Sequence, residues 1–201
     1  MKSKANIFWC TGMSGSGKST LAEHAKVKLE RLGFTVLILD GDVVREKYNV
    51  QLGFDRKDVE KNNLYVVKLC QKERCNYDVI IVPIISPINT VRSTIRRLLS
   101  PSYHLVYIYS DVDTLKKRDT KGLYKKAESG EITDLIGCSK SNPYDIPKDY
   151  DFMVHTGKQS DIAQSKQAFS KFVLSKVFKP SWFVMNDIFC IKINAMFGFT
   201  K

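Results

Sequence analysis

A short run of residues near the amino end of the chain has the composition and spacing of a phosphate-binding loop. The residues from Gly12 to Ser19 fit the pattern G-x-x-x-x-G-K-[ST] at every fixed position. Glycines at these positions let backbone N–H groups turn inward around an anion, and a following helix presents the positive end of its dipole. We expect the lysine to bridge the β- and γ-phosphates of a nucleoside triphosphate, and Ser19 to bind Mg²⁺. The expected nucleotide contacts are Gly12, Ser14, Gly15, Ser16, Gly17, Lys18, Ser19 and Thr20.

Two carboxylates, Asp40 and Asp42, follow the second apolar run of the chain. Beside a nucleotide such a pair can divide the work, with Asp40 helping Ser19 to hold Mg²⁺ and Asp42 accepting the proton of an attacking hydroxyl. Arg45 lies one helical turn after Asp42 and could bind an anionic acceptor through two hydrogen bonds. Taken alone, an aspartate that caps the start of a helix would be the better explanation of this cluster.

The elements that must position these residues are indicated by apolar periodicity. Short continuous apolar runs predict buried strands at Ile7–Cys10, Val36–Leu39, Val79–Val82 and His104–Tyr109. Helices are expected between and after them, over Leu21–Leu32, Asp58–Glu73, Asn89–Leu99 and Asp161–Val177. This alternation predicts an α/β fold of the P-loop type, with three α/β/α layers and a mostly parallel central sheet.

The polar motifs of the chain recur just after its strands. The motifs at Gly12, Asp40 and Ser86 each follow an apolar run. In open parallel sheets, ligands bind outside the carboxyl ends of the strands. We therefore expect these motifs to converge on one edge of the sheet and to form a single site.

Composition limits the classes of function. A chain of 201 residues is long enough for one α/β domain, and its net charge of +11 attracts polyanions of any kind. A nucleic-acid-binding protein is disfavoured because the aromatic and basic residues are not interleaved as base stacking requires. A GTPase is disfavoured because no Asn-Lys-x-Asp run occurs. The five cysteines are odd in number, lack the close pairs of a zinc site and follow no signal peptide, which predicts reduced thiols in a cytoplasmic protein.

The end of the sequence differs from the rest. We expect a kinase domain over residues 1–177 and an apolar tail over residues 178–201. Asp187, Lys192 and Asn194 interrupt the tail, whereas a membrane span needs about 20 mostly uncharged residues, so no span is predicted. Packing on the domain or on a second subunit of a homodimer is the expected role. Membrane contact and disorder are the alternatives.

Several motifs together resemble those of one family, the adenylylsulfate kinases, in both order and spacing. The resemblance extends from about Ile7 to Thr156, and the run Lys-Gly-Leu-Tyr-Lys-Lys-Ala is highly specific to that family. The matching segments are Gly12–Thr20, Leu39–Asp42 with Arg45, Leu52–Phe54, Ile85–Pro87, Arg118–Ala127, Gly130–Glu131 and Pro143–Pro147.

The resemblance implies an activity and a set of roles. The γ-phosphate of MgATP would be transferred to the ribose 3′-hydroxyl of adenosine 5′-phosphosulfate, a small nucleotide substrate. Asp42 would be the general base, and Lys18 and Lys121 would also be catalytic. The segment from Arg118 to Ala127 would form a basic lid over both nucleotides, with Arg118 on the ATP side, and would exclude water. The implied acceptor contacts are Asp42, Arg45, Phe54, Asn62, Ile85, Ser86, Lys121 and Leu135.

Ser86 has two possible roles. It occupies a position at which some members of the family carry a phosphorylatable serine. As an interpretation of the sequence, a plain turn residue before Pro87 is as good as a contact with the acceptor nucleotide.

The departures from the family pattern fall on the acceptor side. Val59 replaces an arginine expected to contact the phosphosulfate arm, and Leu135-Ile136-Gly137 replaces Phe-Thr-Gly, which removes one aromatic face of the adenine clamp. An aromatic stack contributes about 0.5–1.5 kcal/mol beyond its area, and a charge-assisted hydrogen bond about 1.5–3 kcal/mol. The chain is therefore either a weak adenylylsulfate kinase or a relative with another acceptor, such as the cytidine diphosphoramidate kinase of capsule pathways.

A catalytically silent nucleotide-binding protein is a further alternative. A silent site has no need for a complete set of catalytic side chains. The sequence keeps Lys18, Ser19, Asp40, Asp42 and Lys121, which argues against this alternative.

Overall fold

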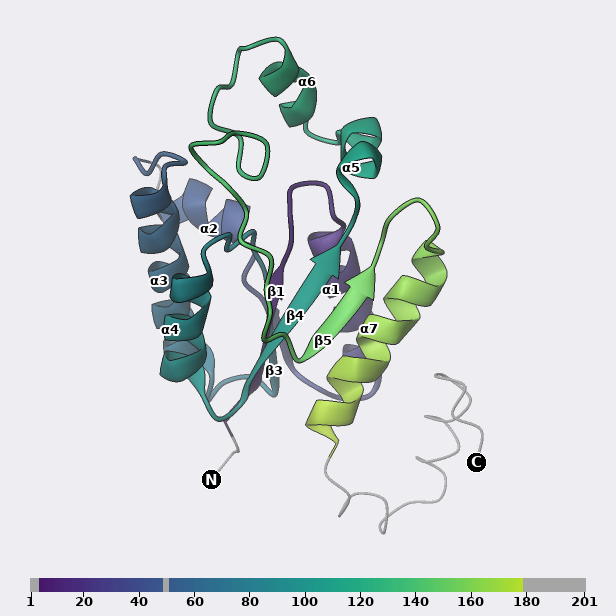
Figure 1. Ribbon diagram of the computed structural model, residues 1–201. Helices are drawn as coiled ribbons and strands as arrows, with labels where there is room; N and C mark the ends of the chain where they lie inside the picture. Colours follow the sequence, from purple (N-terminus) through teal and green to yellow (C-terminus); the bar gives the residue numbers. More distant parts are fainter. Residues whose placement is uncertain (1–3, 49–50, 179–201) are drawn as a thin grey trace.

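The computed structural model describes residues 4–48 and 51–178, and within them it contains one parallel β-sheet (Figure 1). The strand order is β2-β3-β1-β4-β5, and every neighbouring pair is parallel. The strands are β1 (Asn6–Thr11), β2 (Val36–Ile38), β3 (Val79–Pro83), β4 (Tyr103–Tyr109) and β5 (Phe152–His155). The sequence-based prediction of a mostly parallel α/β sheet is confirmed.

Helices cover both faces of this sheet, which gives the predicted three layers. In Figure 1, α1 and α7 lie on one side and α2, α3 and α4 on the other. The helices are α1 (Lys18–Arg31), α2 (Gly41–Tyr48), α3 (Arg56–Glu73), α4 (Asn89–Leu99), α5 (Val112–Arg118), α6 (Leu123–Glu128) and α7 (Ile162–Val177).

Alternation along β1 explains the two cores. Phe8 and Cys10 point to one face and belong to a buried cluster with residues of α1 and α7. Ile7 and Trp9 point to the other face and pack with residues of α3 and α4. Because successive side chains of a strand face opposite ways, a strand covered on both sides must be apolar throughout.

Two short helices, α5 and α6, form a lid that stands above the carboxyl end of the sheet (Figure 1). The Asp111 side chain caps α5 by accepting the N–H of Thr114 at 2.8 Å. Asp119 accepts the N–H groups of Tyr124 and Lys125 at the start of α6, each at 3.0 Å. These aspartates supply the acceptors that short helix starts require.

The structure adds elements that the sequence patterns did not predict. These are β5 and the two lid helices, all short. For α2, the sequence indicated only a helix start near Asp40 and not the extent of the helix. None of the helices among the described residues is long and apolar enough to cross a bilayer. The apolar tail predicted over residues 178–201 lies outside the described residues from position 179 onward, so its packing and the homodimer stay predictions.

Candidate active site

The loop predicted to bind phosphate joins β1 to α1, and its glycines have different structural tasks. A Cβ on Gly12 would lie 2.4 Å from the Ile108 carbonyl oxygen and 2.8 Å from Ser16 Oγ, so β4 passes too close for any side chain. Gly15 and Gly17 have φ values of +76° and +87°, which L-residues with a side chain rarely adopt. The loop therefore depends on all three glycines, and Gly12 serves packing.

Lys18 at the start of α1 reaches back across this loop. Its Nζ donates to the carbonyl oxygens of Gly12 at 2.8 Å and Met13 at 2.9 Å. Burial lowers the pKa of Lys18 to about 8, and the nearby carboxylates of Asp42 and Asp40 oppose this shift only in part. The positive charge of Lys18 is thus poorly compensated, and a bound anion would stabilise it.

Asp40 connects the loop to the start of α2. Its Oδ2 accepts from Ser19 Oγ at 2.6 Å, and its Oδ1 accepts the N–H of Asp42 at 2.9 Å. Asp40 therefore caps a helix start, as the simpler interpretation of the sequence required, and it also contacts the predicted metal ligand Ser19. A hydroxyl and a carboxylate are the hard oxygen donors that Mg²⁺ prefers, so these residues fit that ion.

A cleft of about 760 Å³ lies between the loop, α2 and the lid. It brings together residues far apart in the sequence, as expected for the carboxyl edge of a parallel sheet. Fourteen of the predicted site residues line it: Ser14, Gly15, Gly17, Lys18, Ser19, Thr20, Asp40, Asp42, Arg45, Phe54, Ile85, Arg118, Lys121 and Leu135.

The other four predicted site residues, Gly12, Ser16, Asn62 and Ser86, are not in the lining. Ser16, Asn62 and Ser86 are buried. Asn62 Nδ2 donates to the Gly41 carbonyl at 3.4 Å and so supports the start of α2. Their predicted nucleotide contacts therefore stay predictions.

Ser86 has an unusual backbone conformation. Its φ of 44° lies in the left-handed region, and its buried Oγ has no hydrogen-bond partner among the described residues. Its carbonyl oxygen accepts from Thr11 Oγ1 at 3.2 Å and Arg92 Nη1 at 2.5 Å. These bonds hold the left-handed backbone of Ser86 in place. The turn residue, the acceptor contact and the phosphorylatable serine all stay predictions.

Arg45 and Phe54 form one wall of the cleft. The guanidinium lies over the Phe54 ring at 4.7 Å from its centroid, and Nη1 donates to the carbonyls of Leu52, at 3.2 Å, and Gly53. Burial lowers the pKa of Arg45, opposed by the charges of Asp42 and Asp58. Arg45 thus orders the loop that carries Phe54 and keeps its charge beside the cleft.

The lid closes the site from above through a small number of polar contacts. Lys121 Nζ forms an ion pair with Asp42 Oδ2, and the two side chains are 53% and 57% exposed. Tyr124 OH donates to the Ser14 carbonyl at 2.8 Å, and Arg118 donates to the Thr156 carbonyl. The predicted base, Asp42, is therefore paired with the predicted lid lysine.

Sequence patterns missed two residues that hold this site together. Buried Asn142 donates from Nδ2 to the carbonyls of Phe54 at 2.9 Å and Asp134 at 3.0 Å, and so joins the two walls of the cleft. Tyr124 anchors the lid to the loop. Tyr124 could have been identified because it lies within the basic lid segment Arg118–Ala127. Asn142 could not, because an isolated asparagine has no recognisable sequence pattern.

Val59 was singled out as the replacement of an acceptor-binding arginine. It lies in α3, is only 4% exposed and is not among the residues that line the cleft. The side chain of an arginine introduced at this position would start in the buried core and would have to extend out of it to reach a nucleotide in the cleft. A Val59→Arg substitution is therefore a poor test of acceptor binding in this chain.

Comparison with known proteins agrees with this geometry. The family model of adenylylsulphate kinase matches residues 4–155. The adenylyl-sulfate kinase of Bacillus velezensis is 37% identical over 158 residues, which cover 78% of this chain and 79% of the relative. That of Clostridium kluyveri is 36% identical over 150 residues, covering 75% and 74%.

A solved structure matches as well. The APS kinase of Mycobacterium tuberculosis, in complex with AMPPNP and APS, superposes with a TM-score of 0.78 at 30% identity, covering 86% of this chain and 98% of that one. A gluconokinase from Sinorhizobium meliloti, 12% identical with a TM-score of 0.60, shares the fold alone and covers 92% and 100%. The loop, the cleft and the matched relatives agree, and the chain belongs to the adenylylsulfate kinase family of P-loop phosphotransferases.

Proposed function

We propose that this chain transfers the γ-phosphate of MgATP to a ribose hydroxyl of a nucleotide with a 5′ phospho-anhydride, adenosine 5′-phosphosulfate being the first acceptor. One observation carries the proposal: a single cleft is lined both by Lys18, Ser19 and Asp40 and by Asp42, Arg45 and Phe54. A phosphate donor and a nucleotide acceptor can therefore occupy it together.

The side chains have complementary tasks in this reaction. Lys18 and the loop N–H groups would hold the β- and γ-phosphates, and Ser19 with Asp40 would hold Mg²⁺. Bound Mg²⁺ would neutralise charge on the phosphate oxygens. Asp42 would take the proton from the acceptor hydroxyl.

Lys121 links the lid to the base. Its ion pair with Asp42 is largely exposed, and such pairs contribute only about 0–1 kcal/mol. Lys121 can therefore leave Asp42 at little cost and turn towards phosphate oxygens when both nucleotides are present. This exchange would free the carboxylate at the moment when it is needed as a base.

Two observations support the choice of acceptor, namely the activity of the relatives and the composition of one wall of the cleft. Relatives of similar length are adenylyl-sulfate kinases, and Arg45 beside Phe54 suits an anionic nucleotide with an aromatic base. A second candidate is the cytidine diphosphoramidate acceptor. Leu135 lines the cleft where the family pattern has an aromatic residue, and a smaller pyrimidine needs less stacking surface.

We place this activity in the cytoplasm. Supporting this, the four cysteines among the described residues, Cys10, Cys70, Cys75 and Cys138, are all free thiols. Reduced cysteines are the normal state in that compartment.

The test is a side-by-side assay of ADP formation with adenosine 5′-phosphosulfate and with cytidine diphosphoramidate, with the phosphorylated nucleotide identified by NMR. We expect turnover with at least one acceptor. Asp42→Asn should lower turnover about a hundredfold or more while ATP affinity is kept, because the base is lost but the phosphate loop is not. Glu60→Gln, an exposed carboxylate change on α3 outside the cleft, is the matched control.

The outcomes separate the candidates. Faster turnover of the adenine nucleotide supports adenylylsulfate as acceptor, and faster turnover of the cytidine nucleotide supports the second candidate. Inertness towards both acceptors in the presence of MgATP would refute the proposed reaction. Full activity of Asp42→Asn would remove Asp42 from the role of base.

A further inference from the structure

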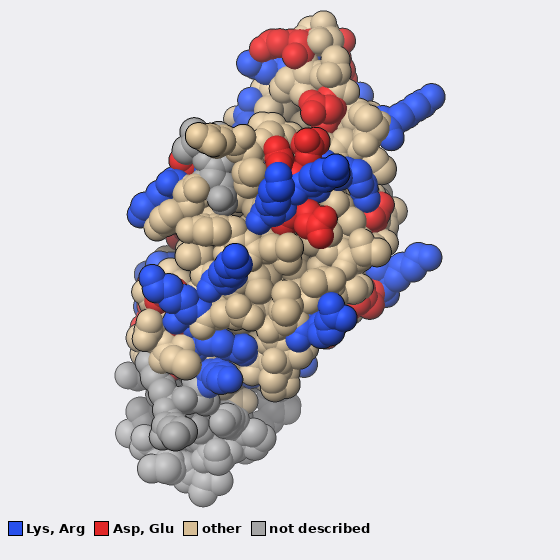
Figure 2. Space-filling model, turned by 90° about the vertical axis from the view of Figure 1, so that its left-hand side faces the viewer, with Lys and Arg blue, Asp and Glu red and all other residues tan. Residues whose placement is uncertain are grey.

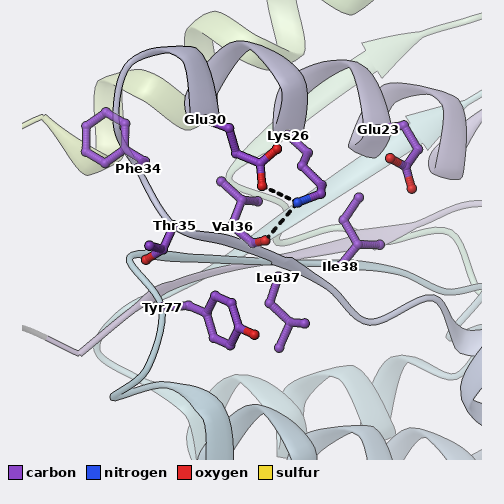
Figure 3. A pocket seen from close by; sticks show the side chains of 9 residues that line it. All are labelled: Glu23, Lys26, Glu30, Phe34, Thr35, Val36, Leu37, Ile38 and Tyr77. Atoms are coloured by element: carbon purple, nitrogen blue, oxygen red, sulfur yellow. Dashed lines mark hydrogen bonds and ion pairs between the residues drawn. The ribbon is translucent and has the colours of Figure 1, made fainter.

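A second concave surface, which shares no lining residue with the cleft, lies along the outer edge of the sheet. This groove has a volume of about 600 Å³ and runs along β2 (Figure 3). In the figure, Glu23, Lys26 and Glu30 of α1 lie above the strand, and Leu37 and Tyr77 lie below it. Apolar side chains thus form the floor of the groove, and charged residues of α1 form one rim.

Along the groove, one edge of strand β2 has no neighbouring strand among the described residues. β2 is the first strand in the sheet order and pairs only with β3 among the described strands. The Thr35 carbonyl and the Leu39 N–H bond towards β3. Because backbone groups alternate along a strand, Val36 and Ile38 carry their N–H and C=O groups on the outer side.

Within residues 4–48 and 51–178, little of the chain covers this edge. Lys26 Nζ donates to the Val36 carbonyl at 3.2 Å and also pairs with Glu30. Exposed strand edges with apolar side chains are templates for pairing with another strand, and natural proteins cover or blunt them. The hydrogen bond from Lys26 covers only the Val36 carbonyl. The N–H and C=O groups of Ile38 and the apolar side chains of the floor are left for another segment to cover.

The chain leads from its last described helix directly to this groove. α7 ends at Val177, and the ring of the next residue, Phe178, packs edge-on against Phe34 with 5.5 Å between centroids. Phe34 itself lines the groove. Phe178, at the end of the described residues, therefore lies beside the amino end of β2. Residues 179–201 lie outside the residues 4–155 matched by the family model.

The composition of these residues suits a strand. The run Ile188–Asn194 reads Ile-Phe-Cys-Ile-Lys-Ile-Asn, rich in the β-branched and aromatic residues that favour strands. Alternate positions place Phe189, Ile191 and Ile193 on one, wholly apolar face. The other face is mixed and carries Ile188, Cys190, Lys192 and Asn194. Ile188 lies ten positions after Phe178, a stretch that can span up to roughly 33 Å, which is ample for reaching along β2.

We propose that the segment Ile188–Asn194 of the same chain binds in this groove as an added strand on the outer edge of β2. Its backbone pairs with Val36 and Ile38, as in other cases of strand addition. Phe189, Ile191 and Ile193 pack below the strand against Leu37 and Tyr77.

Charge fixes which face points to the helix. Glu23 and Glu30 lie on the α1 rim of the groove, and Lys192 is the one charged residue of the proposed strand. With the apolar face directed at Leu37 and Tyr77, alternation directs Lys192 at the α1 rim. On that rim Lys26 pairs with Glu30, and Glu23 is the carboxylate that Lys192 would meet. A shift of the strand pairing by one residue would bury Lys192 against the apolar floor. The sequence pattern therefore specifies which face of the proposed strand points to the floor.

Hydrogen exchange of the full-length chain tests this proposal. We expect the Val36 and Ile38 amides to exchange at least about tenfold more slowly in the wild-type chain than in Ile191→Asp, which puts a carboxylate on the apolar face. Thr200→Asp, the same charge change outside the proposed strand, is the matched control and should exchange like the wild type. The measurement is repeated over a tenfold range of protein concentration, with sedimentation to report the oligomeric state.

Each outcome decides the proposal. Protection that is independent of concentration, lost in Ile191→Asp and kept in Thr200→Asp supports binding of the tail within one chain. Protection that grows with concentration together with a dimer assigns the edge to a second copy and overturns the proposal. Equal exchange of Val36 and Ile38 in the wild type and in Ile191→Asp overturns it as well.

Discussion

Lys18 carries a charge that the ligand-free protein stabilises poorly. Burial at the start of α1 lowers its pKa to about 8, although Asp42 and Asp40 lie near enough to oppose the shift. Its hydrogen bonds go to two backbone carbonyls, which are neutral acceptors. A triphosphate would supply the missing negative charge, so nucleotide binding and protonation of Lys18 must be coupled.

This coupling predicts proton uptake when MgATP binds. Above the lowered pKa, at pH 8.5 to 9, most Lys18 is neutral in the free protein and becomes charged in the complex, so binding should take up about half a proton or more. At pH 7 it is already charged and uptake should be near zero. Calorimetry in buffers of different ionisation enthalpy measures the difference.

The same calorimetry also gives the affinity for MgATP as a function of pH, whose direction of change can be predicted. Affinity for MgATP should fall as pH rises above 8, because protonation of Lys18 then costs free energy. Lys18→Arg keeps its charge at every pH and should remove this dependence. Equal proton uptake at pH 7 and pH 9 in the wild type would contradict the coupling.

Individual residues of the site differ in how far the sequence could predict them. Lys18 and Ser19 belong to a motif whose geometry is local, because one loop and one helix start determine where they lie. Ser86 follows a strand, as predicted, but its φ of 44° turns the side chain into a buried position. That conformation depends on Thr11 and Arg92, which are distant in the sequence, and no local pattern reports it.

At the scale of elements, one buried asparagine joins the two walls of the acceptor side. Asn142 lies in the segment between α6 and β5 and donates to carbonyls of the Phe54 loop and of the segment that contains Leu135. Neither segment is part of a helix or strand. Their spacing, and hence the width of the acceptor side, rests largely on this amide.

Asn142→Ala should therefore loosen the acceptor side and leave the phosphate loop intact. Removing the amide leaves two carbonyls without their donor, at a cost of about 1–3 kcal/mol. We expect KM for the acceptor nucleotide to rise about tenfold while KM for ATP changes little. Steady-state kinetics with each nucleotide varied in turn measure the split.

The control for this change is Asn76→Ala. Asn76 is an exposed asparagine just beyond the end of α3, and its side chain is not among the residues that line the cleft. An equal rise in both KM values for Asn142→Ala would assign it a general structural role, and no change at all would remove it from positioning.

The long elements were predictable and the short ones were not. β1, α3 and α4 follow clear apolar runs or helical spacing, and the structure reproduces them within a few residues. β5 has only four residues at the edge of the sheet, and its pairing with β4 is decided by tertiary contacts. The lid helices are six or seven residues long, and no apolar periodicity marks their starts. Asp111 caps α5, whereas α6 begins after Gly122 and its first turn donates to Asp119.

At the scale of the whole molecule, the net charge is +11. On the face shown in Figure 2, Lys and Arg side chains form several separate groups with uncharged and acidic residues between them, and they do not form one continuous stripe. A nucleic-acid groove needs a basic track along the phosphate backbone. The dispersed pattern on this face agrees with a nucleotide enzyme, in which Lys18, Arg45 and Lys121 concentrate positive charge inside one cleft.

The site joins parts from both halves of the described chain, and unfolding must therefore release any bound nucleotide. At about 100 times its Kd, MgATP should stabilise the folded state by about 2.7 kcal/mol, which raises Tm by roughly 5 to 10 °C for a domain of this size. EDTA should remove most of the gain, because Ser19 and Asp40 then hold no ion that bridges to the phosphates. Ser19→Ala should shrink the difference between magnesium and EDTA, whereas Ser175→Ala, a hydroxyl on α7 bonded to the Phe172 carbonyl, should keep it. Equal Tm gains with and without magnesium in the wild type would show that the Ser19–Asp40 contact has no part in holding a metal, and would leave it only as the cap of α2.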